Sequence, residues 1–166
     1  MEPVVKYVLD RRAAPGARSG LRRGLSTATE HYAYPYLAVW WKDRPYLKAP
    51  LLVFGGLAGT FPNVGFAERV TVGVYAASLV REGQSEASVE RKLIALQTAS
   101  LDRYAVVIRQ LLASGPKAID WNDLWWTVLM WEHPDLAKRT RTRRRILEDF
   151  YQNLTPAETN TKETSS

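Results

Sequence analysis

Two arginine-rich segments carry the residue types best suited to contacting another molecule. Residues 6–23 and 138–145 hold 12 of the 23 basic residues and only one of the 17 acidic residues, Asp10. These segments therefore carry a charge of +11, whereas the rest of the 166-residue chain carries −5. A basic surface on a slightly acidic body is the charge distribution of a polyanion-binding protein. A surface that serves only solubility is the alternative interpretation.

Arginine outnumbers lysine ten to two in these segments. Its planar guanidinium donates in pairs to a phosphate and is more weakly hydrated than an ammonium group, so arginine suits a phosphate backbone. Nothing in the sequence indicates base-specific contacts, and phosphate contacts position a nucleic acid without reading its sequence. We therefore predict sequence-independent binding that depends strongly on salt.

Catalytic groups are scarce. His31 and His133 are the two histidines, and neither lies in a catalytic motif. No HExxH, Gly-x-Ser-x-Gly or glycine-lysine phosphate loop occurs, and Asp120 and Asp123 are interpreted as helix-start residues. The lack of cysteine excludes disulfides, thiol catalysis and cysteine-ligated zinc. We predict a non-enzymatic protein without cofactor, metal or small-molecule substrate.

The six tryptophans could serve as platforms for stacked bases. Trp121, Trp125 and Trp126 lie among aliphatic residues, however, which favours a place in the core. The roles of Trp40, Trp41 and Trp131 stay open.

Helical periodicity dominates the elements that must position these residues, and strand alternation is hard to find. Short amphipathic helices are predicted around residues 4–9 and 21–25, separated by Pro15-Gly16. The glycine-rich stretch 55–65 is predicted to be a helix end and loop rather than an anion-binding nest. Further helices are predicted at residues 35–42, 46–57, 68–81, 85–96 (with Ser85 or Ser88 as the cap), 100–112, 120–130 and from 133–134 onward.

The last of these helices has two faces. Its predicted core face carries the residues Leu136, Ile146, Leu147, Phe150 and Tyr151. Lys138, Arg141 and Arg145 line the opposite face. Six cations on eight helical residues cannot all point at one groove, so we expect Arg144 and Arg145 to pair with Glu148-Asp149.

The fold class is predicted to be all-α, with about eight or nine helices. The length allows either one substantial core, which is the default, or two small helical lobes that share an interface. The expected lobes are residues 1–65 and 66–153, followed by a disordered polar tail at 154–166. The most apolar window, 49–61, spans about 13 residues and is too short to cross a membrane. The charge order of the first residues is the reverse of a secretion signal, so a cytoplasmic location is expected.

Several segments, in order along the chain, resemble the CasB family, the small subunit of the type I-E CRISPR surveillance complex Cascade. IDWNDLWWTVLMW (119–131) and RTRRRILEDFY (141–151) resemble the aspartate-tryptophan helix, the tryptophan pair and the basic closing helix of that family. Supporting matches are GLRRGL (20–25), AYPYL (33–37), VERKLIALQ (89–97) and VIRQLL (107–112). Gln110 and the pair Val74-Tyr75 depart from the basic residues expected of the family.

The resemblance implies a non-catalytic, two-lobed helical subunit that is present in two copies beside the guide-RNA-bearing backbone subunits and the large subunit. It also implies binding to single-stranded DNA and RNA that steadies the opened target DNA, including the displaced strand, while base pairing reads the sequence. A structural spacer that joins protein neighbours is the alternative. By position, the resemblance implies contacts from Arg22, Arg23, Arg44, Arg91, Lys92, Arg109, Arg141 and Arg143. The charge pattern of the last helix adds Lys138, Arg139, Arg144 and Arg145.

Overall fold

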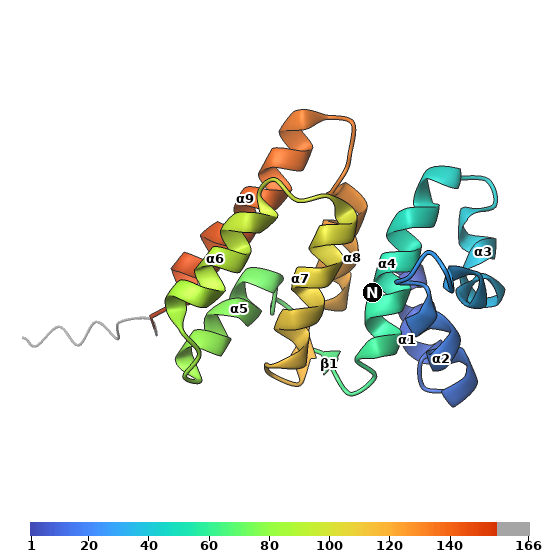
Figure 1. Ribbon diagram of the computed structural model, residues 1–166, viewed down its shortest axis with the longest axis horizontal. Helices are drawn as coiled ribbons and strands as arrows, with labels where there is room; N and C mark the ends of the chain where they lie inside the picture. The colour runs from blue at the N-terminus through green and yellow to red at the C-terminus, as the bar shows by residue number, and fades with distance from the viewer. Residues whose placement is uncertain (156–166) are drawn as a thin grey trace, which may run out of the picture.

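The computed structural model describes residues 1–155, which are mostly α-helical (Figure 1), so the predicted all-α class is confirmed. The helices of this part of the chain are α1 (Pro3–Arg11), α2 (Pro15–Arg23), α3 (Tyr34–Trp41), α4 (Lys48–Thr60), α5 (Val72–Arg81), α6 (Glu86–Leu96), α7 (Leu101–Ala113), α8 (Trp121–Met130) and α9 (Leu136–Asn153). Two 3-10 helices, η1 (Glu30–Ala33) and η2 (Pro45–Leu47), lead into α3 and α4.

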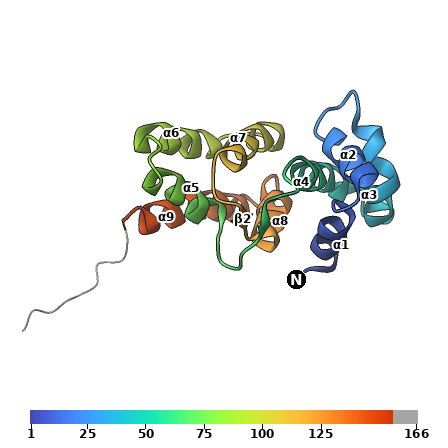
Figure 2. The ribbon, with the colours of Figure 1, turned by 90° about the horizontal axis from the view of Figure 1, so that it is seen from below.

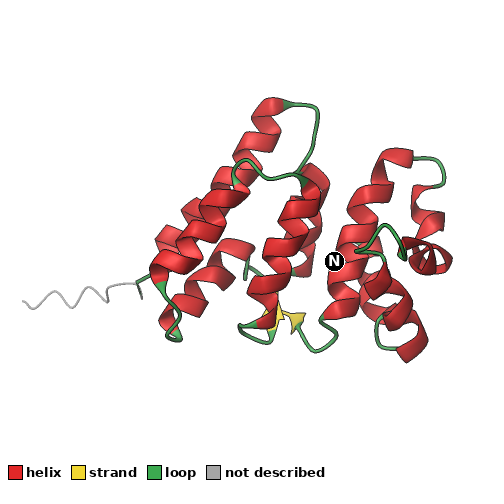
Figure 3. Cartoon of the chain, in the orientation of Figure 1, coloured by secondary structure: helices red, strands yellow, loops and turns green. Residues whose placement is uncertain are grey.

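A two-stranded parallel sheet, unpredicted from the sequence, lies near the lower end of α7 (Figures 1 and 3). Strand β1 (Gly65–Phe66) pairs with β2 (Ala118–Ile119), with Gly65 opposite Ala118. Two residues per strand are too few to show an alternating pattern. The sheet connects the segment after α4 to the segment before α8.

The helices gather in two groups, α1 to α4 at one end and α5 to α9 at the other (Figures 1 and 2). One cluster of buried apolar side chains runs through both groups, from Val5 of α1 to Phe150 of α9. Helix α4 joins them because it contacts α2 and α3 on one side and α7 and α8 on the other. The division into lobes 1–65 and 66–153 stays a prediction.

Part of the predicted tail, residues 156–166, lies outside the described residues. Leu154 is half-buried and packs against the core. Within residues 1–155, no helix is both long enough and apolar enough to cross a membrane. The most apolar stretch instead forms α4, which is buried along most of its 13 residues.

The predicted helix caps Ser85, Ser100 and Asp120 are confirmed, since each side chain accepts a hydrogen bond from the backbone N–H three residues later. The predicted start of the last helix at His133-Pro134 is wrong. Asp135 caps that helix by accepting from the backbone N–H of Ala137 at 2.9 Å. A carboxylate at this position satisfies donors that the first turn leaves open, so the helix begins after it.

The prediction that residues 55–65 form a helix end and loop is wrong at its start, because α4 continues to Thr60. A Cβ atom on Gly59 would lie only 2.8 Å from the backbone O of Arg18 and the backbone N of Arg22. Glycine is therefore required where α2 crosses α4, and it marks a close helix contact rather than a turn. Gly73 plays the same part in α5, where a Cβ atom would lie 2.3 Å from the carbonyl O of Ile146 in α9.

Candidate nucleic-acid interface

Helix α2 presents the first basic face. Leu21 is fully buried, whereas Arg22 and Arg23 are exposed on the outer side of the helix. The guanidinium of Arg23 lies 4.5 Å from the centre of the Tyr32 ring, in cation–π geometry. Arg18 and Arg22 are one turn apart and line a notch of about 190 Å³ between α2 and the end of α4. The close contact at Gly59 thus fixes the helix that carries these arginines.

Arg12, in the same basic segment, has an internal role. Its side chain is buried and donates to the carbonyl oxygens of Phe61 at 2.9 Å and Val64 at 2.7 Å. The guanidinium also lies 4.9 Å from the centre of the Trp121 ring. Burial lowers the pKa of Arg12 to about 10. This cation ties α1 to the loop after α4, and sequence charge alone did not distinguish it from its exposed neighbours.

Helix α9 presents the second basic face. Ile146 and Phe150 are buried and anchor the second half of the helix. Lys138, Arg141 and Arg144 are exposed, and within residues 1–155 none of them has a side-chain hydrogen bond or ion pair. Arg139 is half-buried on the same stretch. The predicted core face is wrong at its two ends, which are Leu136, 65% exposed, and Tyr151, 48% exposed.

Arg143 is half-buried, and its guanidinium is held by protein acceptors. It donates from Nη1 to the carbonyl O of Gln97 at 3.0 Å and from Nη2 to the carbonyl O of Trp131 at 2.8 Å. Its guanidinium lies 4.5 Å from the centre of the Trp131 ring. Burial, followed by the charge of Arg139, lowers the pKa of Arg143. Arg143 therefore fastens α9 to the ends of α6 and α8.

Arg145 forms an ion pair with Asp123 of α8, and the expected pairing with Glu148-Asp149 is wrong. Asp149 instead accepts a hydrogen bond from the Thr71 hydroxyl at 2.7 Å. Burial raises the pKa of Asp123, and the neighbouring Arg145 opposes that rise. A pair between helices cannot be read from i to i+4 spacing, which is why the sequence missed it.

The remaining predicted residues lie on other elements. Arg91, exposed, and Lys92, half-buried, lie on α6, which packs beside α9. Arg109 is exposed on α7 and lines a pocket of about 300 Å³. Arg44 immediately precedes η2 and lines a much larger groove. Most predicted contact residues therefore lie on α2 or on α9, whereas these four lie on other elements.

Most tryptophans are structural. Trp121 and Trp131 are fully buried, and each indole N–H donates to a backbone carbonyl oxygen. Trp125 is also buried, as predicted, but the prediction for Trp126 is wrong because its side chain is 45% exposed. Trp40, like Trp41, is half-buried. Base stacking on the buried indoles is therefore excluded.

Each of the two histidines interacts with a neighbouring residue. Nδ1 of His133 accepts a hydrogen bond from the backbone N–H of Asp135 at 3.0 Å. The ring of His31, an exposed residue, lies 4.3 Å from that of Tyr32. Among residues 1–155, no group of three or more potential ligands is placed to hold a metal ion.

Comparison with known families identifies the chain. Residues 17–151 match the family of the CRISPR-associated protein Cse2. This match includes most of α2 and most of α9. The chain belongs to the Cse2 family. The resemblance to CasB drawn from sequence motifs is therefore confirmed.

Solved structures share the Cse2-family fold. CasB from Thermus thermophilus has a TM-score of 0.71 and 22% identity, over 92% of this chain and 99% of that one. A chain of a CRISPR RNA-guided surveillance complex in a pre-nicking state has a TM-score of 0.73 and 21% identity, over 91% of each chain. A chain of Escherichia coli Cascade bound to a PAM-containing double-stranded DNA target has a TM-score of 0.67 and 19% identity, over 91% of this chain and 93% of that one. No curated protein matches.

Proposed function

We propose that this Cse2-family chain is a non-catalytic subunit of a Cascade-type CRISPR surveillance complex. In that complex it binds the nucleic-acid backbone without reading its sequence and steadies the opened target DNA, including the displaced strand. The observation that carries the proposal is the pair of exposed arginine faces on α2 and α9, within the segment that matches the family. Solved proteins of the same fold, from complexes described as RNA-guided and DNA-bound, support it.

The proposed interface contains only some of the cations of the two basic segments. We assign phosphate contacts to the exposed or half-exposed cations Arg18, Arg22, Arg23, Lys138, Arg139, Arg141 and Arg144. We leave Arg143 and Arg145 out of this interface, because a cation held by protein acceptors gains less from a phosphate. Arg44, Arg91, Lys92 and Arg109 remain proposed contacts on the strength of the family resemblance alone.

Backbone binding without sequence preference follows from the chemistry of these faces. Guanidinium groups on the outer side of a helix meet phosphates, whereas base reading requires side chains that reach base edges in a groove. Base pairing with a guide RNA supplies the sequence reading in such complexes. The proposed partners are guide-RNA-bearing backbone subunits, the large subunit, a second copy of this chain, and single-stranded DNA and RNA in the cytoplasm.

Site-specific photo-crosslinking in the assembled complex tests this proposal. A photoreactive residue replaces Arg22 in one variant and Arg141 in another, and a third variant carries it at Glu82, an exposed residue after α5, as the control. We expect crosslinks to DNA or RNA from the first two positions and none from the third. Crosslinks only to protein from both basic faces would instead favour a structural spacer whose arginines meet acidic subunit surfaces.

A further inference from the structure

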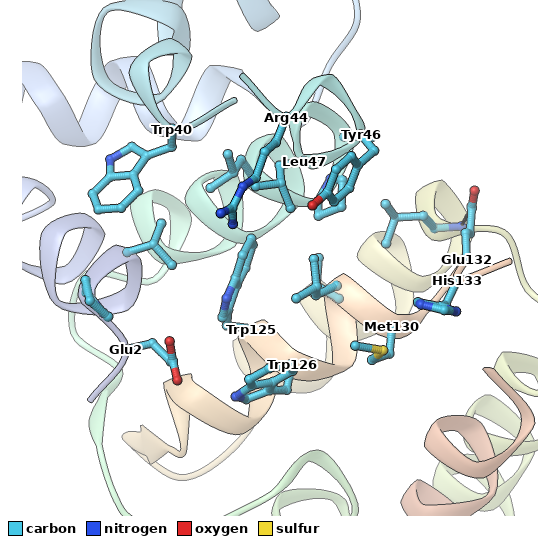
Figure 4. Close-up of a pocket in the computed structure, with 18 of the residues that line it drawn as sticks. Glu2, Trp40, Arg44, Tyr46, Leu47, Trp125, Trp126, Met130, Glu132 and His133 are labelled. Atoms are coloured by element: carbon cyan, nitrogen blue, oxygen red, sulfur yellow. Dashed lines mark hydrogen bonds between the residues drawn. The ribbon is translucent and has the colours of Figure 1, made fainter. Parts of the chain in front are cut away.

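A large groove lies between α3, η2 and the start of α4 on one side and α8 on the other (Figure 4). Its volume is about 1160 Å³. One wall carries Trp40, Arg44 and Tyr46, and the opposite wall carries Trp125 and Trp126 (Figure 4). Small-molecule sites usually occupy about 300–1,000 Å³ and enclose their ligand, whereas this groove has a larger volume and is open to solvent.

The groove leaves large apolar side chains in contact with solvent. Val39 and Tyr46 are each 71% exposed, and Trp126 is 45% exposed. Aromatic residues gathered on a surface in this way are typical of the centre of a protein–protein interface. Buried Trp125, on the same wall as Trp126, packs against Phe54 with ring centres 5.4 Å apart, so this wall stands on a packed base.

The charge around the groove is opposite to that of the basic faces. Three carboxylates line it, from Glu2, Asp43 and Glu132, against a single guanidinium, that of Arg44. The carboxylate of Glu132 also accepts a hydrogen bond from the first backbone N–H of α7, which fixes its position. Carboxylates repel phosphate, so a nucleic acid is a poor occupant despite the exposed aromatic rings.

We infer that this groove docks an amphipathic segment of a neighbouring protein subunit, one that inserts a large apolar side chain and carries lysine or arginine on its flanks. The apolar side chain would contact Tyr46 and Trp126, and the basic flanks would meet the carboxylates of Glu2 and Asp43. The chain's own residues 156–166, PAETNTKETSS, contain no large apolar side chain and do not fit this description. The inference rests on the proposed membership of a multi-subunit complex.

This assignment divides the surface by chemistry. The arginine faces of α2 and α9 contact nucleic acid, while the acidic-rimmed groove contacts protein. Among the proposed contact residues, Arg44 differs because it lines the groove. Its side chain points toward the Trp125 wall of the groove (Figure 4), so its substitution should affect assembly more than DNA binding.

Assembly with the guide-RNA-bearing backbone subunits and large subunit from the same genome tests the inference. The variants are Trp126→Ala, Tyr46→Ala and Asp43→Lys, and the matched controls are Ile94→Ala, an apolar residue 51% exposed on α6, and Glu82→Lys. We expect each groove variant to raise the apparent Kd for assembly by about ten-fold or more, and each control by less than about two-fold. Tyr46 is so exposed that its substitution leaves the fold intact, which circular dichroism checks.

Each other outcome contradicts the inference in a distinct way. Groove variants that assemble like the wild-type chain overturn it and leave the proposed function standing. Weaker single-stranded DNA binding by Trp126→Ala, with normal assembly, would make the groove a nucleic-acid site. Loss of self-association alone, measured by analytical ultracentrifugation, would make it an interface between copies. A wild-type chain that fails to assemble at all refutes the proposed function itself.

Discussion

The guanidinium of Arg143 lies 4.5 Å from the centre of the Trp131 ring and donates to the Trp131 carbonyl oxygen at 2.8 Å. Arg12 has the same arrangement at the other end of α8, over Trp121 and against two carbonyl oxygens. In both cases an arginine from a basic segment holds a buried tryptophan in place. A high arginine content therefore serves the fold as well as the surface.

Replacing Arg143 with alanine should destabilise the protein. The substitution removes two charge-assisted hydrogen bonds and leaves the carbonyl oxygens of Gln97 and Trp131 without that donor. We expect the free energy of unfolding in urea to fall by about 2–3 kcal/mol. Arg141→Ala is the matched control, because this exposed arginine on the same helix should change stability by less than about 0.5 kcal/mol. Equal effects of the two substitutions would contradict the internal role of Arg143.

Replacing a glycine at a close contact between two helices should also destabilise the protein. In Gly73→Ala the new Cβ atom would lie 2.3 Å from the carbonyl O of Ile146, so α5 and α9 must separate. The expected cost is about 1–3 kcal/mol in the free energy of unfolding. Gly16→Ala is the control, because a Cβ atom there would meet no other atom within 4 Å and alanine favours helix by about 0.5–1 kcal/mol. A neutral Gly73→Ala would show that the contact between α5 and α9 is loose.

The buried hydroxyl of Tyr104 should make the stability of the folded protein fall at alkaline pH. Its hydroxyl is buried without a hydrogen-bond partner among residues 1–155, and burial raises its pKa well above 10.0. In the unfolded chain the phenol ionises near pH 10, whereas in the folded chain it stays neutral, so stability falls as pH rises above that value. Tyr104→Phe should remove this loss and, at pH 7, raise the free energy of unfolding by about 1 kcal/mol.

Urea unfolding of the wild-type protein and Tyr104→Phe between pH 8 and pH 11 measures this effect. The difference in stability should be constant up to about pH 9 and widen above pH 10. Tyr75, whose pKa burial raises to about 12, keeps its own sensitivity in both proteins. Parallel curves would show that Tyr104 ionises as easily in the folded as in the unfolded chain.

Much of the fold follows from local sequence signals. Ser85, Ser100 and Asp120 each precede an apolar repeat of helical period, and each caps the helix that begins after it. These signals act over a few residues and are therefore visible without the fold. The predicted start of α9 is wrong because His133-Pro134 also resembles a helix start, and the true cap, Asp135, directly follows Pro134.

What the sequence could not show depends on contacts between distant segments. Gly59 resembles a helix breaker until α2 is seen to cross it, and Asp123 resembles an ordinary helix-start acid until Arg145 is placed beside it. The same limit applies to the interface. Charge clustering located α2 and α9, but only burial separates Arg143 from exposed Arg141 and Arg144. The groove was missed because its residues come from segments far apart in the chain.

The salt dependence of single-stranded DNA binding tests the central claim most directly. The test variant is Arg22→Ala/Arg141→Ala/Arg144→Ala, and the control of equal charge is Lys42→Ala/Arg103→Ala/Lys117→Ala, three cations that are also exposed but lie outside both faces. Fluorescence anisotropy measures the association constant of each full-length protein at several salt concentrations. Each lost phosphate contact should make the slope of log K against log salt shallower by about 0.7.

The test variant should therefore show a slope shallower by about 2 and an affinity at least about ten-fold lower in 0.1 M salt, while the control keeps the wild-type slope. Equal slopes for the wild-type protein and the test variant would contradict a nucleic-acid interface on α2 and α9.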